Sequence, residues 1–226
     1  MSPFGYHPVK HTPGLWFHNS KRTLFILVVD GFCVQYFSTE DADHFLNALR
    51  SKYLITVVLE ATVYIGIKLT WDYLHRTFIL SMPSYFHKSL HIFQNILRGG
   101  KEYSPHSCAL IQYGQKIQYA DLLETAEYMS DKETNLVQHV CRTFLYYAIA
   151  IDNTILPALS NISSEQSKST TNTAKQVAKL LNCIASNPQA RIQYISSGMK
   201  LDIHSNTSYL SVAQARSWAS GVHFLT

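Results

Sequence analysis

The chain has 226 residues, 46% hydrophobic and 15% charged, which is an ordinary globular composition with length for one large or two small domains. Its net charge of +4 suits nucleic-acid binding and a slightly basic globular protein equally well. The sequence lacks Cys-x-x-Cys pairs and a signal-peptide-like apolar start, so we expect neither a zinc ribbon nor secretion, but an intracellular protein of the cytoplasm or nucleus. The apolar runs are too short or too interrupted to span a bilayer, so we expect no membrane partner.

The N-terminal part predicts a hairpin and then a helix. Two apolar runs flank the pair Asp30-Gly31, a strong signal for a two-residue turn. The next segment predicts a helix that Thr39 caps and that ends near Lys52. The apolar runs are residues 24–29 and 32–37.

Short strands and one further helix are expected next. Residues rich in β-branched side chains predict three strands, with Trp71-Asp72 as the turn between the last two. A proline at the first turn and two glycines beyond the end delimit the helix, whose buried face is expected to include Tyr85 and Leu90. The expected strands are residues 53–59, 63–69 and 76–80, and the expected helix is 83–97.

The second half of the chain predicts helices and then strands. Residues 98–130 show no sustained hydrophobic period and are rich in Gly, Ser and Pro, which indicates a linker. Apolar spacing then predicts three helices, the first with one apolar face formed by Leu136, Val140, Phe144, Leu145 and Ala148. Two strands joined by a turn at Ser197-Gly198 and a last strand follow. The expected helices begin near residues 131, 154 and 171, and the expected strands are 191–195, 200–204 and 222–225.

Six segments, in one order along nearly the whole chain, carry a resemblance to a known family. They are an apolar strand ending in Val-Asp-Gly (25–31), Tyr-Ile-Gly-Ile-Lys-Leu (64–69), a strand-to-helix segment (80–90), a helix with a following acid (142–152), the helix segment 174–181, and His-Ser-Asn-Thr-Ser-Tyr (204–209). In this order they resemble the copia-type retrotransposon Pol polyprotein, from the late palm of its reverse transcriptase into the start of its ribonuclease H-like domain.

The resemblance implies an α+β fold: a partial reverse-transcriptase palm of antiparallel strands plus helices, a helical connection and a truncated ribonuclease H-like strand region. The implied divisions are 1–97 for the palm, 98–130 for a linker, 131–190 for the connection and 191–226 for the ribonuclease H-like start. The implied activities are RNA-directed DNA polymerase and ribonuclease H, and the implied partners are an RNA or DNA primer–template and other Pol segments.

Both implied reactions need pairs of Mg²⁺ or Mn²⁺ ions held by several carboxylates. Asp30 stands at the first of the family's paired acids, but Gly31 replaces the second. Asn206, an uncharged amide, stands at the first ribonuclease H acid. The family's other acids are expected before Met1 and beyond Thr226. We therefore expect a catalytically inactive fragment in which Asp30 and Asn206 are remnants and the ions are not bound productively.

Each candidate residue also has a plainer interpretation. Asp30 can merely shape a turn, which we favour. Asp202 is either a displaced metal ligand or a solvated strand residue, and His87 with His91 lacks an evident third ligand. Four cations form a candidate nucleic-acid track, although ordinary surface charge is slightly favoured. These cations are Lys21, Arg22, Lys68 and Arg76.

Three functions follow for testing. The first is the inactive fragment. The second is a non-enzymatic nucleic-acid binder or polymerase partner derived from a retroelement. The third, least favoured, is an enzyme whose missing acids come from a partner chain. A palm without its first strands would also expose a sheet edge and apolar area, so we expect poor solubility in isolation.

Overall fold

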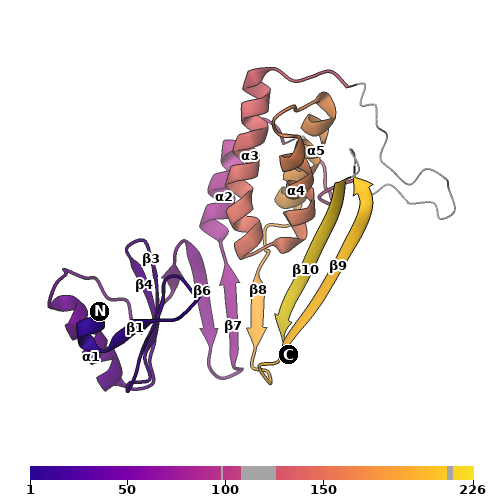
Figure 1. Ribbon diagram of the computed structural model, residues 1–226. Coiled ribbons are helices and arrows are strands. Elements are labelled where there is room, and N and C mark those ends of the chain that lie inside the picture. Colours follow the sequence, from indigo (N-terminus) through magenta and orange to yellow (C-terminus); the bar gives the residue numbers. More distant parts are fainter. Residues whose placement is uncertain (98, 108–125, 213–215) are drawn as a thin grey trace. The chain divides into compact units, whose positions relative to one another are not determined.

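The computed structural model describes residues 1–97, 99–107, 126–212 and 216–226 (Figure 1). The chain forms two compact units, Met1–Thr70 and Trp71–Thr226. Helices and antiparallel strands occur together in the described residues, which confirms the α+β class. The assignment of a reverse-transcriptase palm, and the four-part division of the chain, stay predictions.

The first unit is built on a four-stranded antiparallel meander in the order β1-β2-β3-β4, with one long helix. Its buried core consists of aromatic and aliphatic side chains from the sheet and the helix. The elements are η1 (Ser2–Phe4), β1 (Tyr6–Pro8), β2 (Leu15–His18), β3 (Leu24–Val28), β4 (Gly31–Gln35) and α1 (Thr39–Arg50).

Aromatic packing holds α1 against the sheet. The Phe45 ring lies 4.8 Å from the Phe25 ring and 5.5 Å from the Tyr6 ring, and all three side chains are buried. Burial of each such ring contributes about 1.5–3 kcal/mol. The Ser38 hydroxyl, rather than that of Thr39, caps the helix by accepting from the Asp41 amide at 3.2 Å. The residue that caps the helix is therefore Ser38, one residue before the predicted cap, Thr39.

The predicted Asp30-Gly31 turn is displaced by one residue. Val28 pairs with Gly31, so the two turn residues are Val29 and Asp30, and Gly31 begins β4. The register places Phe25 opposite a core-facing valine and Leu27 opposite Phe32, beside the α1 core. Core packing therefore determines the register and overrides the turn preference of Asp-Gly.

Two other strand predictions fail in the first unit. Residues 53–59 form no strand, although they are apolar. The expected strand 63–69 is a hairpin of β5 (Val63–Tyr64) and β6 (Ile67–Asp72). Its turn residues Ile65 and Gly66 have φ of 46° and 81°, the positive angles that a tight hairpin turn requires. Gly66 thus divides an apolar segment whose sequence looked like one continuous strand.

The turn after β6 also differs from the prediction. Trp71 and Asp72 belong to β6, and the chain turns over residues 73–76. The Asp72 carboxylate accepts from the His75 amide at 2.9 Å, an Asx-type contact that stabilises the turn. Asp72 therefore contributes to the turn from the end of the strand.

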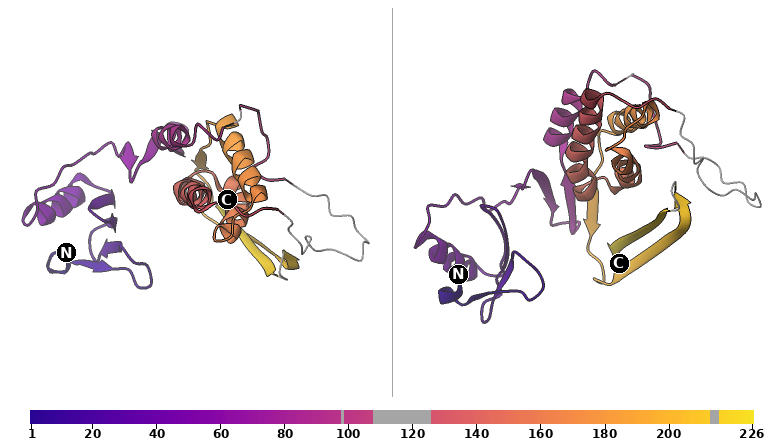
Figure 2. Two further views of the ribbon diagram at one scale, coloured as in Figure 1. Left: turned by 90° about the horizontal axis from the view of Figure 1, so that it is seen from above. Right: turned by 45° about the horizontal axis from the view of Figure 1, so that its top comes forward.

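Four helices pack together in the second unit (Figure 2). The Phe86 ring of the first helix lies 5.8 Å from Tyr147, and Phe93 lies 6.0 Å from Phe144. These four side chains are buried and anchor the bundle. The helices are α2 (Pro83–Ile92), α3 (Asp131–Ala150), α4 (Leu156–Glu165) and α5 (Thr171–Ser186), with η2 (Asn153–Ile155) before α4.

Capping boxes mark two of the expected helix starts. Ser130 with Glu133 caps α3, and Thr170 with Thr173 caps α5. The three helices predicted after residue 131 are confirmed. The apolar face predicted for α3 is confirmed in part: Val140, Phe144 and Ala148 are buried. It is wrong for two residues, because Leu136 is 38% and Leu145 is 48% exposed. Val137, Cys141 and Tyr147 are buried instead. Helix α2 ends at Ile92, short of the predicted residue 97.

The predicted hairpin at Ser197-Gly198 does not form. The strand before it pairs antiparallel with β7, and the strand after it pairs with β10. The Ser196 amide donates to the Arg76 carbonyl at 3.0 Å, which continues the pairing of β8 with β7. Pairing with β7 and β10 therefore replaces the predicted pairing of these two neighbouring strands with each other. These strands are β7 (Thr77–Ser81), β8 (Ile192–Ile195), β9 (Leu201–Val212) and β10 (Arg216–Leu225).

The predicted linker, residues 98–130, lies largely outside the described residues. Where it is described, it contacts α5: the Glu102 amide donates to Ser186, and the Glu102 carboxylate lies 3.8 Å from the Lys179 ammonium. Among the described helices, none combines the length and apolar character needed to cross a bilayer.

Candidate functional site

Asp30 lies at the exposed tip of the β3–β4 hairpin, as the sequence predicted. The residue before it, Val29, is 93% exposed and has a φ of +55°. A β-branched residue at positive φ is strained, at a cost of order 1–3 kcal/mol. The tip therefore presents one carboxylate to solvent next to a strained, exposed valine.

Gly31 occupies ordinary strand backbone rather than a glycine-requiring conformation. A Cβ atom placed there would lie 3.6 Å from the Val28 carbonyl oxygen and 3.7 Å from the Tyr64 ring, both ordinary contacts. The fold therefore accepts a larger side chain at this position. The backbone at this position would therefore also tolerate an acidic residue.

Two of the predicted nucleic-acid cations lie at the other end of the same hairpin. Lys21 forms an ion pair with Asp41 at 3.7 Å, and the Arg22 guanidinium lies 5.8 Å from the centre of the Phe37 ring. They precede β3, so its five residues, roughly 17 Å of strand, separate them from Asp30. Both cations already have partners within the first unit.

The other two predicted cations are exposed. Lys68 lies on β6 opposite Val63, within the first unit. Arg76 ends the turn before β7, with a φ of +50°, and belongs to the second unit. Arg22 is exposed as well, so in the first unit both Arg22 and Lys68 lie open to solvent. The proposed four-residue track stays a prediction.

Asn206 lies exposed on β9, opposite Ser220. Its side-chain oxygen accepts from the Thr207 amide at 2.9 Å. Asp202 lies on the same strand face, four residues away, and accepts from the Thr226 hydroxyl at 2.7 Å. Four residues span roughly 13 Å, too far for both oxygens to bind one ion. Asp202 is therefore not brought to Asn206 as a displaced ligand.

No metal-binding cluster is evident in the parts of the chain that the structure describes, where no group of three or more His, Cys, Asp or Glu side chains is suitably placed. His87 and His91 are both exposed on α2. His204 instead stacks on the Phe224 ring at 5.4 Å. Of these three histidines, two are therefore surface residues on α2 and the third packs against a ring.

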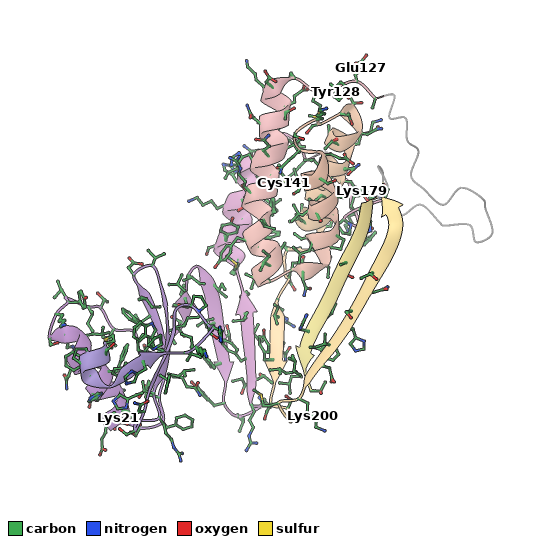
Figure 3. The ribbon with its side chains drawn as sticks, viewed as in Figure 1. Lys21, Glu127, Tyr128, Cys141, Lys179 and Lys200 are labelled. Carbon is green, nitrogen blue, oxygen red and sulfur yellow. The ribbon has the colours of Figure 1, made fainter. Side chains whose placement is uncertain are left out.

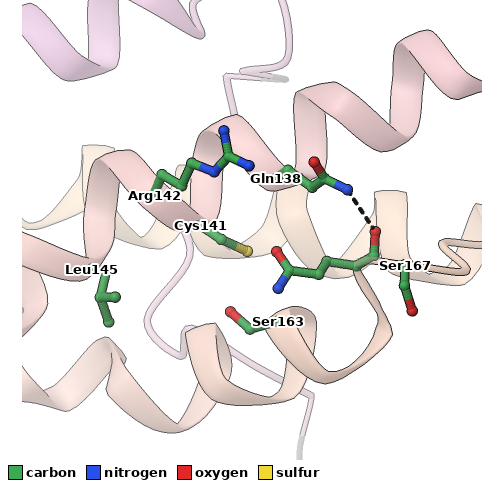
Figure 4. Close-up of a pocket in the computed structure, with 7 residues that line it drawn as sticks. Gln138, Cys141, Arg142, Leu145, Ser163 and Ser167 are labelled. Atoms are coloured by element: carbon green, nitrogen blue, oxygen red, sulfur yellow. Dashed lines mark hydrogen bonds between the residues drawn. The ribbon is translucent and has the colours of Figure 1, made fainter.

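A pocket that the sequence did not indicate lies between α3 and the end of α4 (Figure 4). Its volume is about 350 Å³. The Gln138 amide donates across it to the Gln166 carbonyl at 3.4 Å. Cys141 lies on the side of α3 toward α4 (Figure 3), and burial raises the pKa of its thiol while the Ser163 hydroxyl lowers it. A thiol with a raised pKa is a poor nucleophile at neutral pH.

A polar network in the first unit was also not foreseen. The Tyr6 hydroxyl lies 3.1 Å from Nδ1 of His44, and burial raises the pKa of Tyr6 to about 12. Burial, with Lys21 and His18 nearby, lowers the pKa of His44. His18 Nδ1 accepts from the backbone amides of Ser20 and Lys21, so Nε2 carries the proton that is donated to the Phe4 carbonyl. These contacts fasten η1 to the β2–β3 loop.

Comparisons of the chain with protein-family models, with curated proteins and with solved structures found no match. The resemblance to the copia-type Pol polyprotein therefore depends on the ordered sequence segments alone.

Proposed function

We propose that the chain is a catalytically inactive fragment of a copia-type retrotransposon Pol polyprotein, from its reverse transcriptase and ribonuclease H-like regions. The observation that supports this most is the β3–β4 hairpin, which carries Asp30 at its tip and Gly31 directly after it. The helix α1 follows the hairpin and packs on the same small sheet. This order of elements is the one that the resemblance implies for the palm.

The proposed inactivity follows from counting carboxylates. Two divalent ions about 3.5–4 Å apart need several shared acids to bind and to stabilise the attacking and leaving oxygens. At the hairpin tip, Gly31 contributes none. Asp41 forms an ion pair with Lys21 near the opposite end of the hairpin. On β9, Asn206 brings an amide in place of a charged ligand.

Primer extension tests this proposal. The full chain is incubated with a primer–template, nucleotides and Mg²⁺ or Mn²⁺, next to a heat-denatured sample and to the Asp30→Asn variant. We expect all three to give equal background. Template-dependent product from the native chain that disappears in Asp30→Asn would overturn the proposal.

A second candidate is non-enzymatic nucleic-acid binding, alone or as a partner of a polymerase chain. It is favoured by the net charge of +4 and by the exposed cations Lys68 and Arg76. The logarithm of the Kd for a primer–template duplex should then rise linearly with the logarithm of the salt concentration, because phosphate contacts release counterions. Absence of binding at low salt would exclude this candidate.

A further inference from the structure

Four aromatic rings in the second unit form a stacked row that we call the aromatic row: Tyr73, Trp71, Phe78 and Tyr194. The Trp71 and Phe78 rings lie 3.9 Å apart with 23° between their planes. Phe78 lies 6.1 Å from Tyr194 at 24°, and Tyr73 lies 6.1 Å from Trp71 at 8°. Neighbouring ring planes in the row thus lie within 24° of each other.

Strand pairing places these rings together. Phe78 on β7 and Tyr194 on β8 are directly opposite each other, so their side chains lie on one face of the sheet. Trp71 stands at the end of β6, and Tyr73 follows in the next turn. The hydrogen bond from the Ser196 amide to the Arg76 carbonyl holds that turn beside the end of β8. The row is therefore attached to regular backbone.

The aromatic row is exposed, unlike the ring cluster of the first unit. Tyr73 is 83% exposed, Trp71 42% and Tyr194 44%. In the buried cluster, by contrast, Tyr6 meets Phe45 edge to face at 80°. Trp71 and Phe78 cover each other's faces at 3.9 Å, so it is the exposed rings at the two ends of the row, Tyr73 and Tyr194, that offer surface on which another flat ring can stack.

The segments that carry the row are positively charged. Residues 71–81 and 191–200 hold three cations and one carboxylate. That carboxylate, Asp72, lies 2.7 Å from the His75 ring nitrogen, so it has a partner already. The cations are Arg76, Arg191 and Lys200, of which Lys200 precedes β9 (Figure 3).

We propose that the aromatic row is a stacking surface for the bases of single-stranded nucleic acid. Bases stack on aromatic side chains whatever their sequence, and phosphates favour a surface with excess positive charge. The exposed parallel rings and the surplus of cations match these two requirements. The inference rests on the second function proposed above, nucleic-acid binding, and names the surface and the kind of strand.

Fluorescence anisotropy of a labelled 20-nucleotide oligo(dT) with the full chain tests the inference at low salt. Tyr73→Ala and Tyr194→Ala each raise the Kd about fivefold or more, because base stacking is lost. Tyr73→Phe keeps the ring and binds as the native chain does. Tyr103→Ala is the matched control, since Tyr103 is 85% exposed in the same unit but outside the row. Circular dichroism confirms that each variant folds.

Other outcomes separate the proposals. Equal binding by the native chain and both alanine variants overturns the aromatic row and leaves nucleic-acid binding intact. If the native chain binds neither oligo(dT) nor duplex, both proposals fail. If sedimentation shows a dimer that Tyr73→Ala dissociates, and oligo(dT) does not bind, the row is a contact between copies and the inference is wrong.

Discussion

Val28 and Gly31 face each other as the last pair of the β3–β4 ladder, which leaves Val29 and Asp30 alone in the turn. This pairing assigns the two candidate positions to different surroundings. Asp30 is exposed in the turn, whereas Gly31 is a strand residue beside Tyr64. The consequences for metal binding and for stability can be tested separately.

Gly31→Asp should create a pair of adjacent acids at the hairpin tip. A Cβ atom at this position would have its nearest neighbours at 3.6 and 3.7 Å, so it fits without backbone movement. We expect Mn²⁺ affinity, measured by calorimetry, to rise about tenfold over the native chain. Gly31→Asn is the control of equal size without charge. Equal Mn²⁺ binding by the two variants would show that charge at this position does not matter.

Val29→Gly should stabilise the first unit. It relieves the strain of a β-branched residue at a φ of +55° while removing little packing, because Val29 is 93% exposed. After the entropy cost of glycine, the free energy of unfolding should increase by about 0.5–1 kcal/mol in urea denaturation. Val28→Gly, one residue earlier in β3, should lower it instead. A loss of stability in Val29→Gly would contradict the turn geometry.

Phe144→Ala should destabilise the second unit by about 3–5 kcal/mol, because its ring on α3 is fully buried against Phe93, directly after α2. Ile149→Ala is a control on the same helix, at a side chain that is 64% exposed, and should change the stability by about 0.5 kcal/mol or less. Thermal or urea unfolding measures both. Similar losses in the two variants would show that α3 presents a different face to the bundle.

Stability should fall at alkaline pH through Tyr6. Its pKa is about 12 in the folded chain, against an ordinary value of 10.0, because burial disfavours the phenolate. The unfolded chain therefore releases the proton first, and the stabilising contribution, complete below pH 10, is lost as pH rises through about 12.

Urea denaturation between pH 9 and 11 measures this effect. Tyr6→Phe should show a shallower decline in stability, while Tyr103→Phe, at an exposed position, should follow the native chain. Identical slopes for Tyr6→Phe and the native chain would contradict the assignment.

Local sequence signals predicted much of the fold. Ser130 and Thr170 start helices with capping boxes, and these helices lie where apolar spacing placed them. The β3–β4 hairpin formed as well, with its turn displaced by one residue. Signals of this kind act within a few residues of the chain, which is why sequence patterns reveal them.

The failure of the predicted hairpin at Ser197-Gly198 came from contacts between distant segments. Nothing near Tyr194 indicates that it pairs with Phe78 rather than with the strand that follows it. The complete aromatic row therefore could not be predicted, because Tyr194 lies more than a hundred residues beyond the other three rings. The exposed tip position of Asp30, by contrast, depends on a local turn, and the sequence was sufficient for it.

Electron paramagnetic resonance of the native chain titrated with Mn²⁺ tests the central claim most directly. A tip with one carboxylate should give no tightly bound, spin-coupled pair of ions, and the spectrum should not change in Asp30→Asn. Two coupled Mn²⁺ ions that depend on Asp30 would contradict the claim, because they would show that the hairpin tip still assembles a two-metal centre.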